Sequence, residues 1–159
     1  MDKKLQQKLF RKYPYMFKDR KLTGDKTRIC DGICCGDGWY ELIDNACQQL
    51  KFLQIRLSVY VSFFQVKEKF AGLRIYCNKV EYPYGSSDPC YDSKEEKSIS
   101  EIIRSIIHRA ECQSFHTCDV CGGYRDENKK LGSWIYAICD DCWWKFLKKN
   151  KIRKNELKK

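Results

Sequence analysis

The chain has 159 residues, of which 43% are hydrophobic and 14% aromatic, so it can build a buried core and is not a disordered protein. No apolar run reaches the roughly 18 residues that cross a bilayer, which excludes an integral membrane protein. The net charge is +10, and residues 1–29 and 143–159 each carry +7 while residues 30–142 carry −4. Basic ends of this kind favour contacts with phosphate groups, and the alternative is that they only keep the protein soluble.

The start of the chain, and not its eleven cysteines, predicts a reducing compartment. The first seven residues lack the apolar core of a secretory signal, and an odd number of cysteines cannot pair completely within one chain. In a reducing compartment, cysteines bind metals or stay free more often than they form disulfides. We therefore expect a cytoplasmic protein.

Two helices are predicted in the first third of the chain. Apolar residues at helical spacing predict a short amphipathic helix over 3–12 and a second helix that starts at Trp39 and continues to Leu53. Asp37 is the expected N-cap of the second helix. Residues 13–38 contain a proline and four glycines and are predicted to form a loop.

A β-hairpin is predicted to follow. Apolar and polar residues alternate over 54–66, which predicts a strand, and again over 73–77, which predicts its partner. Residues 67–72 are the expected turn. The hairpin should pack on the preceding helix.

The second half of the chain begins with a predicted irregular loop over 80–97, rich in proline, glycine, serine and acidic residues. Ser98 and Glu101 form a capping-box pattern, and the isoleucines that follow share one helix face, so a helix is predicted from Ser98. The loop is the candidate surface for a protein partner.

The strongest signal for a site is a pair of Cys-x-x-Cys motifs, Cys118/Cys121 and Cys139/Cys142. Four thiolates can hold one tetrahedral Zn²⁺ ion, and the two-residue gap lets the backbone aim both sulfurs of a pair at the metal. Gly122 and Gly123 follow the first pair and can adopt the positive φ that such a turn requires. Since four protein ligands leave no position for water, the predicted zinc site is structural. Residues 134–138 are expected to form a strand that leads into the second pair.

The other seven cysteines are less specific. Cys30, Cys34 and Cys35 are a candidate second metal site, and the alternative is that they are loop thiols. Cys47 is predicted to lie in the core, and Cys77 and Cys90 are candidates to complete the second site. Cys112 and His116 are candidate extra ligands beside the first Cys-x-x-Cys pair, and the alternative is that they are unrelated to it.

The sequence does not predict an enzyme. It contains only two histidines, His108 and His116, and none of the hydrolase, metalloprotease or phosphate-loop motifs. A zinc deaminase would need a different spacing between histidine and glutamate, and it would leave Cys139 and Cys142 without a role.

Two basic and aromatic segments are candidates for nucleic-acid contact. Residues 67–76 join a basic turn to a strand that carries an outward arginine and tyrosine, and residues 143–149 begin a basic helix. The alternative for the first segment is a hairpin whose charges pair locally. The candidate contact residues are Lys67, Lys69, Arg74, Tyr76, Lys145, Lys148, Lys149, Arg153 and Lys154.

An ordered set of short motifs resembles a widespread family of small, mostly uncharacterised proteins that bacteriophages and prophages encode. The set comprises residues 38–44 (GWYELID), 67–76 (KEKFAGLRIY), 110–111, 114, 117–122, 134 and 139–142. The resemblance implies a phage accessory protein with a zinc ribbon that works in the cytoplasm of the bacterial host. By analogy, such proteins regulate transcription or block host defences, and an inhibitor of an RNA-guided immune complex would suit a small basic protein.

The predicted fold is α+β, with helices packed on a short antiparallel β-hairpin, then a four-cysteine zinc ribbon and a basic C-terminal helix. Residues 1–97 are expected to form the α/β core, and residues 98–159 add a helix, the ribbon at 118–142 and the terminal helix, all within one unit. The expected function is non-enzymatic: zinc-dependent binding of a nucleic acid, RNA in preference, or of a ribonucleoprotein, in the manner of an anti-CRISPR inhibitor. The alternative is a zinc-ribbon module that docks on a protein and regulates host or phage transcription.

Overall fold

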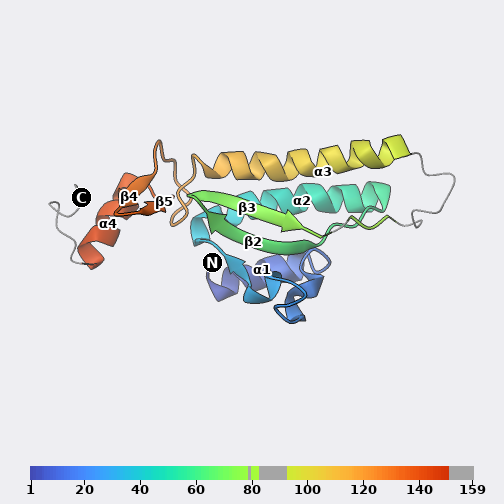
Figure 1. Ribbon diagram of the computed structural model, residues 1–159, viewed down its shortest axis with the longest axis horizontal. Helices are drawn as coiled ribbons and strands as arrows, with labels where there is room; N and C mark the ends of the chain where they lie inside the picture. Colours follow the sequence, from blue (N-terminus) through green and yellow to red (C-terminus); the bar gives the residue numbers. More distant parts are fainter. Residues whose placement is uncertain (79, 83–92, 151–159) are drawn as a thin grey trace.

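The computed structural model describes residues 1–78, 80–82 and 93–150 and has the predicted α+β fold. Three helices, α1 (Lys3–Lys12), α2 (Tyr40–Leu57) and α3 (Ser93–Ser114), surround a three-stranded sheet. A two-stranded sheet and helix α4 (Asp140–Lys149) extend from one end of this core (Figure 1).

The central sheet has the order β1-β2-β3. Strands β2 (Phe63–Lys69) and β3 (Gly72–Cys77) form the antiparallel hairpin, and β1 (Ile33–Cys34) pairs with β2 in parallel. Val66 lies opposite Ile75, and both side chains are buried in the core. Because side chains alternate along a strand, the neighbouring residues Lys67 and Arg74 lie opposite each other on the other face.

Helix α3 covers the free edge of β3. The backbone N–H of Leu73 donates to Ser114 Oγ at 2.8 Å, and that of Ile75 donates to Glu111 Oε1 at 2.9 Å. These side chains replace the partner strand that an exposed edge would otherwise seek. Helix α3 also packs along α2, so the two long helices lie side by side (Figure 1).

The predicted helix over 3–12 is confirmed, but the predicted strand over 54–66 is correct only for its last four residues, 63–66. Residues 54–57 form the last turn of α2, its C-cap residue Ser58 has φ 52°, and β2 begins only at Phe63. Apolar residues near this junction satisfy both a period of two and a period of 3.6, so the pattern did not separate them. Ile55, expected in the strand, is 69% exposed on the helix surface.

The predicted turn is also shorter than expected. The strands run on to Lys69 and resume at Gly72, which leaves only Phe70 and Ala71 in the turn, both with positive φ. Strand β1 was not predicted, because two residues are too short to show an alternating pattern.

Two capping predictions are wrong. Asp37 lies in a short 3₁₀ helix (Asp37–Trp39), and its carboxylate accepts a hydrogen bond from the backbone N–H of Asp2 at 2.6 Å, not from α2. Ser98 and Glu101 lie inside α3, which begins at Ser93. Residues 83–92 of the predicted loop lie outside the described residues.

The C-terminal third of the chain contains a small β-hairpin and a helix around the two Cys-x-x-Cys pairs. Strands β4 (Lys129–Leu131) and β5 (Trp134–Tyr136) form an antiparallel hairpin, and α4 follows. A small separate core lies between them and consists of Cys118, Ile138, Cys142, Trp143 and Leu147. We refer to residues 118–149 as the four-cysteine module.

Within the described residues, none of the helices combines the length and the apolar character needed to cross a bilayer.

Candidate metal centre

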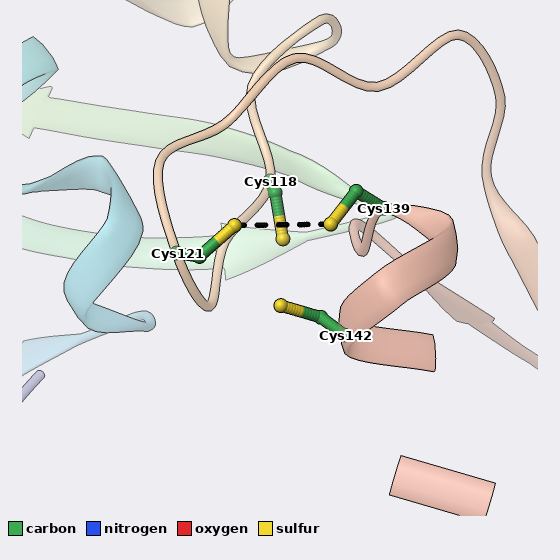
Figure 2. Close-up of side chains that lie close together, drawn as sticks. All are labelled: Cys118, Cys121, Cys139 and Cys142. Atoms are coloured by element: carbon green, nitrogen blue, oxygen red, sulfur yellow. Dashed lines mark hydrogen bonds between the residues drawn. The ribbon is translucent and has the colours of Figure 1, made fainter. Parts of the chain in front are cut away.

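The four predicted cysteines come together at the start of α4. The sulfur atoms of Cys118, Cys121, Cys139 and Cys142 all lie within 4.8 Å of one another. Figure 2 shows the four side chains converging on one space between the loop at 118–121 and the first turn of α4. Since two sulfurs bound to one tetrahedral Zn²⁺ at about 2.3 Å are about 3.8 Å apart, the 3.7 Å between Cys121 Sγ and Cys139 Sγ fits a shared ion.

The first pair of cysteines sits on a tight turn. The backbone N–H of Gly122 donates to the carbonyl of Cys118 at 2.9 Å, and the N–H of Cys118 donates to the carbonyl of Gly123 at 2.8 Å. Gly122 has φ 75°, as predicted for the residue after the pair. The N–H of Gly123 points at Cys121 Sγ, 3.4 Å away, and an N–H donor in this position stabilises a thiolate.

The second pair lies on the N-terminus of α4. Cys139 occupies the N-cap position and Cys142 lies in the first turn. The partial positive charge of a helix N-terminus favours anionic groups, and a Zn²⁺ ion with four thiolates carries a net charge of −2. The helix therefore helps to offset the charge of the loaded site.

The pKa values of Cys118, Cys121 and Cys142 are shifted in different directions because their environments differ. The N–H of Gly123 lowers the pKa of Cys121, whereas burial raises the pKa values of Cys118 and Cys142. Four ionised thiolates this close together need a cation to offset their repulsion. The donor set and its spacing thus fit a divalent metal such as Zn²⁺.

The module is docked on the core through the loop at 36–38. The backbone N–H of Gly36 donates to Asp119 Oδ1 at 2.6 Å, and that of Gly38 donates to the carbonyl of Asp119 at 2.8 Å. The two backbone segments approach so closely that a Cβ atom at Gly36 would lie 2.0 Å from the carbonyl oxygen of Asp119. A Cβ atom at Gly38 would lie 2.2 Å from the carbonyl oxygen of Cys118. Glycine is required at both positions by this contact.

Two side chains complete the joint. Trp39 is fully buried, and its indole N–H donates to the carbonyl of Thr117 at 2.9 Å. Arg125, only 3% exposed, donates to the carbonyls of Ala71, Ser114 and Thr117 at 2.8–3.1 Å. It therefore links the turn of the hairpin, the end of α3 and the four-cysteine module.

Sequence reasoning missed Arg125 and Asp119. An arginine beside acidic residues resembles an ordinary surface charge, and no local pattern marks it as buried. The one available signal for the joint was the closely spaced pair of glycines before Trp39, which marks a place where two backbones approach.

The structure does not bring Cys30, Cys34 and Cys35 together as a second metal site. In the part of the chain that the structure describes, the four-cysteine cluster is the one group of three or more possible ligands positioned to share an ion. Cys30 and Cys34 instead contact nearby carbonyls, and burial raises the pKa of Cys35 to about 12. Cys90 lies outside the described residues.

The predicted nucleic-acid contacts form two separate groups. Lys67, Lys69, Arg74 and Tyr76 lie on the face of the hairpin opposite the buried Val66 and Ile75. Lys145, Lys148 and Lys149 are exposed on α4. Arg153 and Lys154 lie outside the described residues.

The exposed face of the hairpin pairs cations with aromatic rings. The ammonium of Lys67 lies 5.5 Å from the centre of the Tyr76 ring, that of Lys69 lies 5.2 Å from Phe70, and the Arg74 guanidinium lies 5.5 Å from Phe115. Among the described residues, none of these three cations forms an ion pair with an acid. The expectation that the hairpin charges pair locally is therefore not met.

Comparisons of this chain with protein-family models, with curated protein sequences and with solved structures found no match.

Proposed function

We propose that this chain is a zinc-stabilised, non-catalytic module that binds nucleic acid through the exposed face of its β-hairpin. One observation carries the proposal: Lys67 and Arg74 lie directly opposite each other on adjacent strands, and no described acid neutralises either. Like charges in this arrangement destabilise a sheet, whereas an anionic ligand that spans both strands would turn the repulsion into attraction.

The remaining groups on this face support the same ligand. Lys69 extends the row of positive charge toward the turn, and Tyr76 offers an exposed ring beside Lys67. The exposed lysines of α4 provide a second basic surface for phosphates. Phosphate contacts are strong but carry little sequence information, so we expect broad specificity.

The test measures, by fluorescence anisotropy at 50–200 mM salt, how tightly the zinc-loaded chain binds labelled RNA, single-stranded DNA and duplex DNA. The double variant Lys67→Glu/Arg74→Glu should bind at least about tenfold more weakly and lose part of the salt dependence. The variant Lys51→Glu/Arg56→Glu changes the net charge equally on α2 and is the matched control. Equal losses in both variants, or binding that salt does not affect, would contradict the proposal.

For the cellular role we propose inhibition of a host defence complex, on the strength of the motifs that resemble phage and prophage proteins. A small basic protein that grips RNA can compete for the guide of an RNA-guided nuclease. Capture of the tagged chain from a bacterial host, with and without nuclease treatment, tests this role. A partner that is lost on nuclease treatment supports it, whereas a partner that stays bound favours the alternative of direct protein docking.

A further inference from the structure

Phe70 stands at the tip of the β2–β3 hairpin in a conformation that most residues avoid. It is 74% exposed, and both Phe70 (φ 54°) and Ala71 (φ 57°) have positive φ. Two-residue hairpin turns with positive φ at both central positions normally use asparagine, aspartate or glycine. Phenylalanine and alanine are therefore energetically costly choices here.

The surrounding structure holds this turn in place. Glu68 Oε1 accepts a hydrogen bond from the N–H of Ala71 at 2.6 Å, and the Ala71 carbonyl accepts one from the buried Arg125 at 2.8 Å. The turn is thus braced from both sides while its aromatic ring remains exposed to solvent. A strained, braced and exposed aromatic residue is more simply explained by a ligand contact than by stability.

The neighbouring groups indicate what this ring would contact. Phe70 lies at one end of a row that also contains the Phe115 and Tyr76 rings, each of which has a cation over it. Aromatic rings interleaved with unpaired cations match a chain of phosphates that carries unstacked bases. A duplex offers no free base face to an aromatic ring along its length, because its bases are already stacked on one another.

We infer that the hairpin face binds single-stranded nucleic acid and that Phe70 stacks on an unpaired base. This inference rests on the proposed function and adds to it the form of the ligand and the residue that recognises bases. The ammonium of Lys69, beside the same ring, then contacts the phosphate next to the stacked base.

The test uses the zinc-loaded full chain and three labelled probes: a 12-nucleotide single-stranded RNA, an abasic strand with the same number of phosphates, and a blunt RNA duplex. The wild-type chain should bind the normal strand at least about fivefold more tightly than the abasic strand or the duplex. Phe70→Asn should weaken binding to the normal strand by about 5- to 150-fold and leave binding to the abasic strand unchanged. A DNA version of the strand shows whether the 2′-hydroxyl contributes.

Two further variants separate folding from binding. Phe70→Trp keeps a stacking ring and should retain the affinity of the wild type. The double variant Phe70→Asn/Ala71→Gly has a favourable turn sequence, so it should unfold at the same or a higher urea concentration and still bind weakly.

Equal affinity for the normal and abasic strands, or an equal effect of Phe70→Asn on both, would overturn the inference. If the abasic strand still binds in a salt-dependent manner that Lys67→Glu/Arg74→Glu weakens, the proposed function stands without the stacking. Absence of binding to all three probes overturns both.

Discussion

Asp119 Oδ1 accepts a 2.6 Å hydrogen bond from the backbone N–H of Gly36, a residue that lies 83 positions earlier in the chain. Asp119 stands directly after the first metal-site cysteine, and Gly36 lies just before the helix that organises the core. Asp119 is half-buried, and this burial raises the pKa of its carboxyl group above the ordinary value. The four-cysteine module and the core are thus joined by direct hydrogen bonds.

The close backbone contact at this joint predicts that Gly38→Ala is strongly destabilising. The new methyl group would lie 2.2 Å from the carbonyl oxygen of Cys118, and a backbone atom cannot move aside as a flexible side chain can. We expect a loss of about 3 kcal/mol or more in the free energy of unfolding, measured by urea denaturation of the zinc-loaded protein.

Gly24→Ala is the matched control for that substitution. A methyl group there meets its nearest atom at 3.7 Å, which is an ordinary contact. The free energy of unfolding should change by less than about 1 kcal/mol. Equal effects of the two substitutions would show that the joint is looser than the structure indicates.

The cysteine cluster predicts one bound zinc ion per chain and a module that unfolds without it. Removal of zinc with a strong chelator, or the substitution Cys118→Ser, should expose Trp143 and abolish its near-ultraviolet circular dichroism signal, because the module core is small. Elemental analysis gives the metal content, and Cys30→Ser should leave it at one. A Cys118→Ser chain that stays folded with zinc bound would contradict the assignment.

The hydrogen bonds between the four-cysteine module and the core predict that removal of zinc changes hydrogen exchange at specific amides of the core. Gly36 and Gly38 donate to Asp119, so their N–H groups should exchange with solvent faster after zinc removal. The N–H of Ile75, which donates to Glu111 on α3, should keep its protection and serves as the internal control. Hydrogen exchange measured by NMR distinguishes these amides, and unchanged rates at the glycines would exclude the coupling.

The buried hydrogen bonds of Arg125 predict that replacing its side chain lowers the free energy of unfolding substantially. Arg125→Met would leave the carbonyls of Ala71, Ser114 and Thr117 without their buried donor, and we expect a cost of about 3 kcal/mol in the free energy of unfolding. Arg104→Met, on the exposed surface of α3, should cost less than about 1 kcal/mol in the same urea experiment. A similar cost for both would show that the hydrogen bonds of Arg125 add little.

Tyr13 predicts a loss of stability at high pH. Burial raises its pKa to about 12, and its hydroxyl group lies 3.0 Å from Asp44 Oδ1. Because the folded state favours the protonated form, this contribution is complete below pH 10, the ordinary tyrosine pKa, and is lost as the pH rises toward 12. The expected loss is on the order of 1–3 kcal/mol.

Urea denaturation between pH 8 and 11.5 measures this effect. Tyr13→Phe should be about 1 kcal/mol less stable at pH 8, since it lacks the hydrogen bonds to Asp44, and should decline less steeply above pH 10. An equally steep decline in both proteins would assign the alkaline transition to other groups.

Local patterns predicted most elements but misplaced several of their ends. The stripes over 3–12 and along α2 and α3 have strong helical periods, and each of these helices is present. The end of α2 and the start of β2 were misplaced because the residues between them fit two periods. Asp37 was read as a cap because its residue type suits one, whereas its carboxylate bonds to Asp2 from a distant part of the chain.

The cysteines show how far sequence alone reaches in this protein. Two Cys-x-x-Cys pairs determined a four-sulfur site, because the chemistry of a tetrahedral metal constrains ligand type and spacing within a short stretch of chain. Only the tertiary structure decided that the other described cysteines stay apart from that site, that Arg125 is buried and that Lys67 faces Arg74. Arg125 is buried against Ala71, 54 positions earlier in the chain, and local periodicity carries no information about which distant backbones meet. The pairing of Lys67 with Arg74 depends on the exact two-residue length of the turn between them, which periodicity does not determine either.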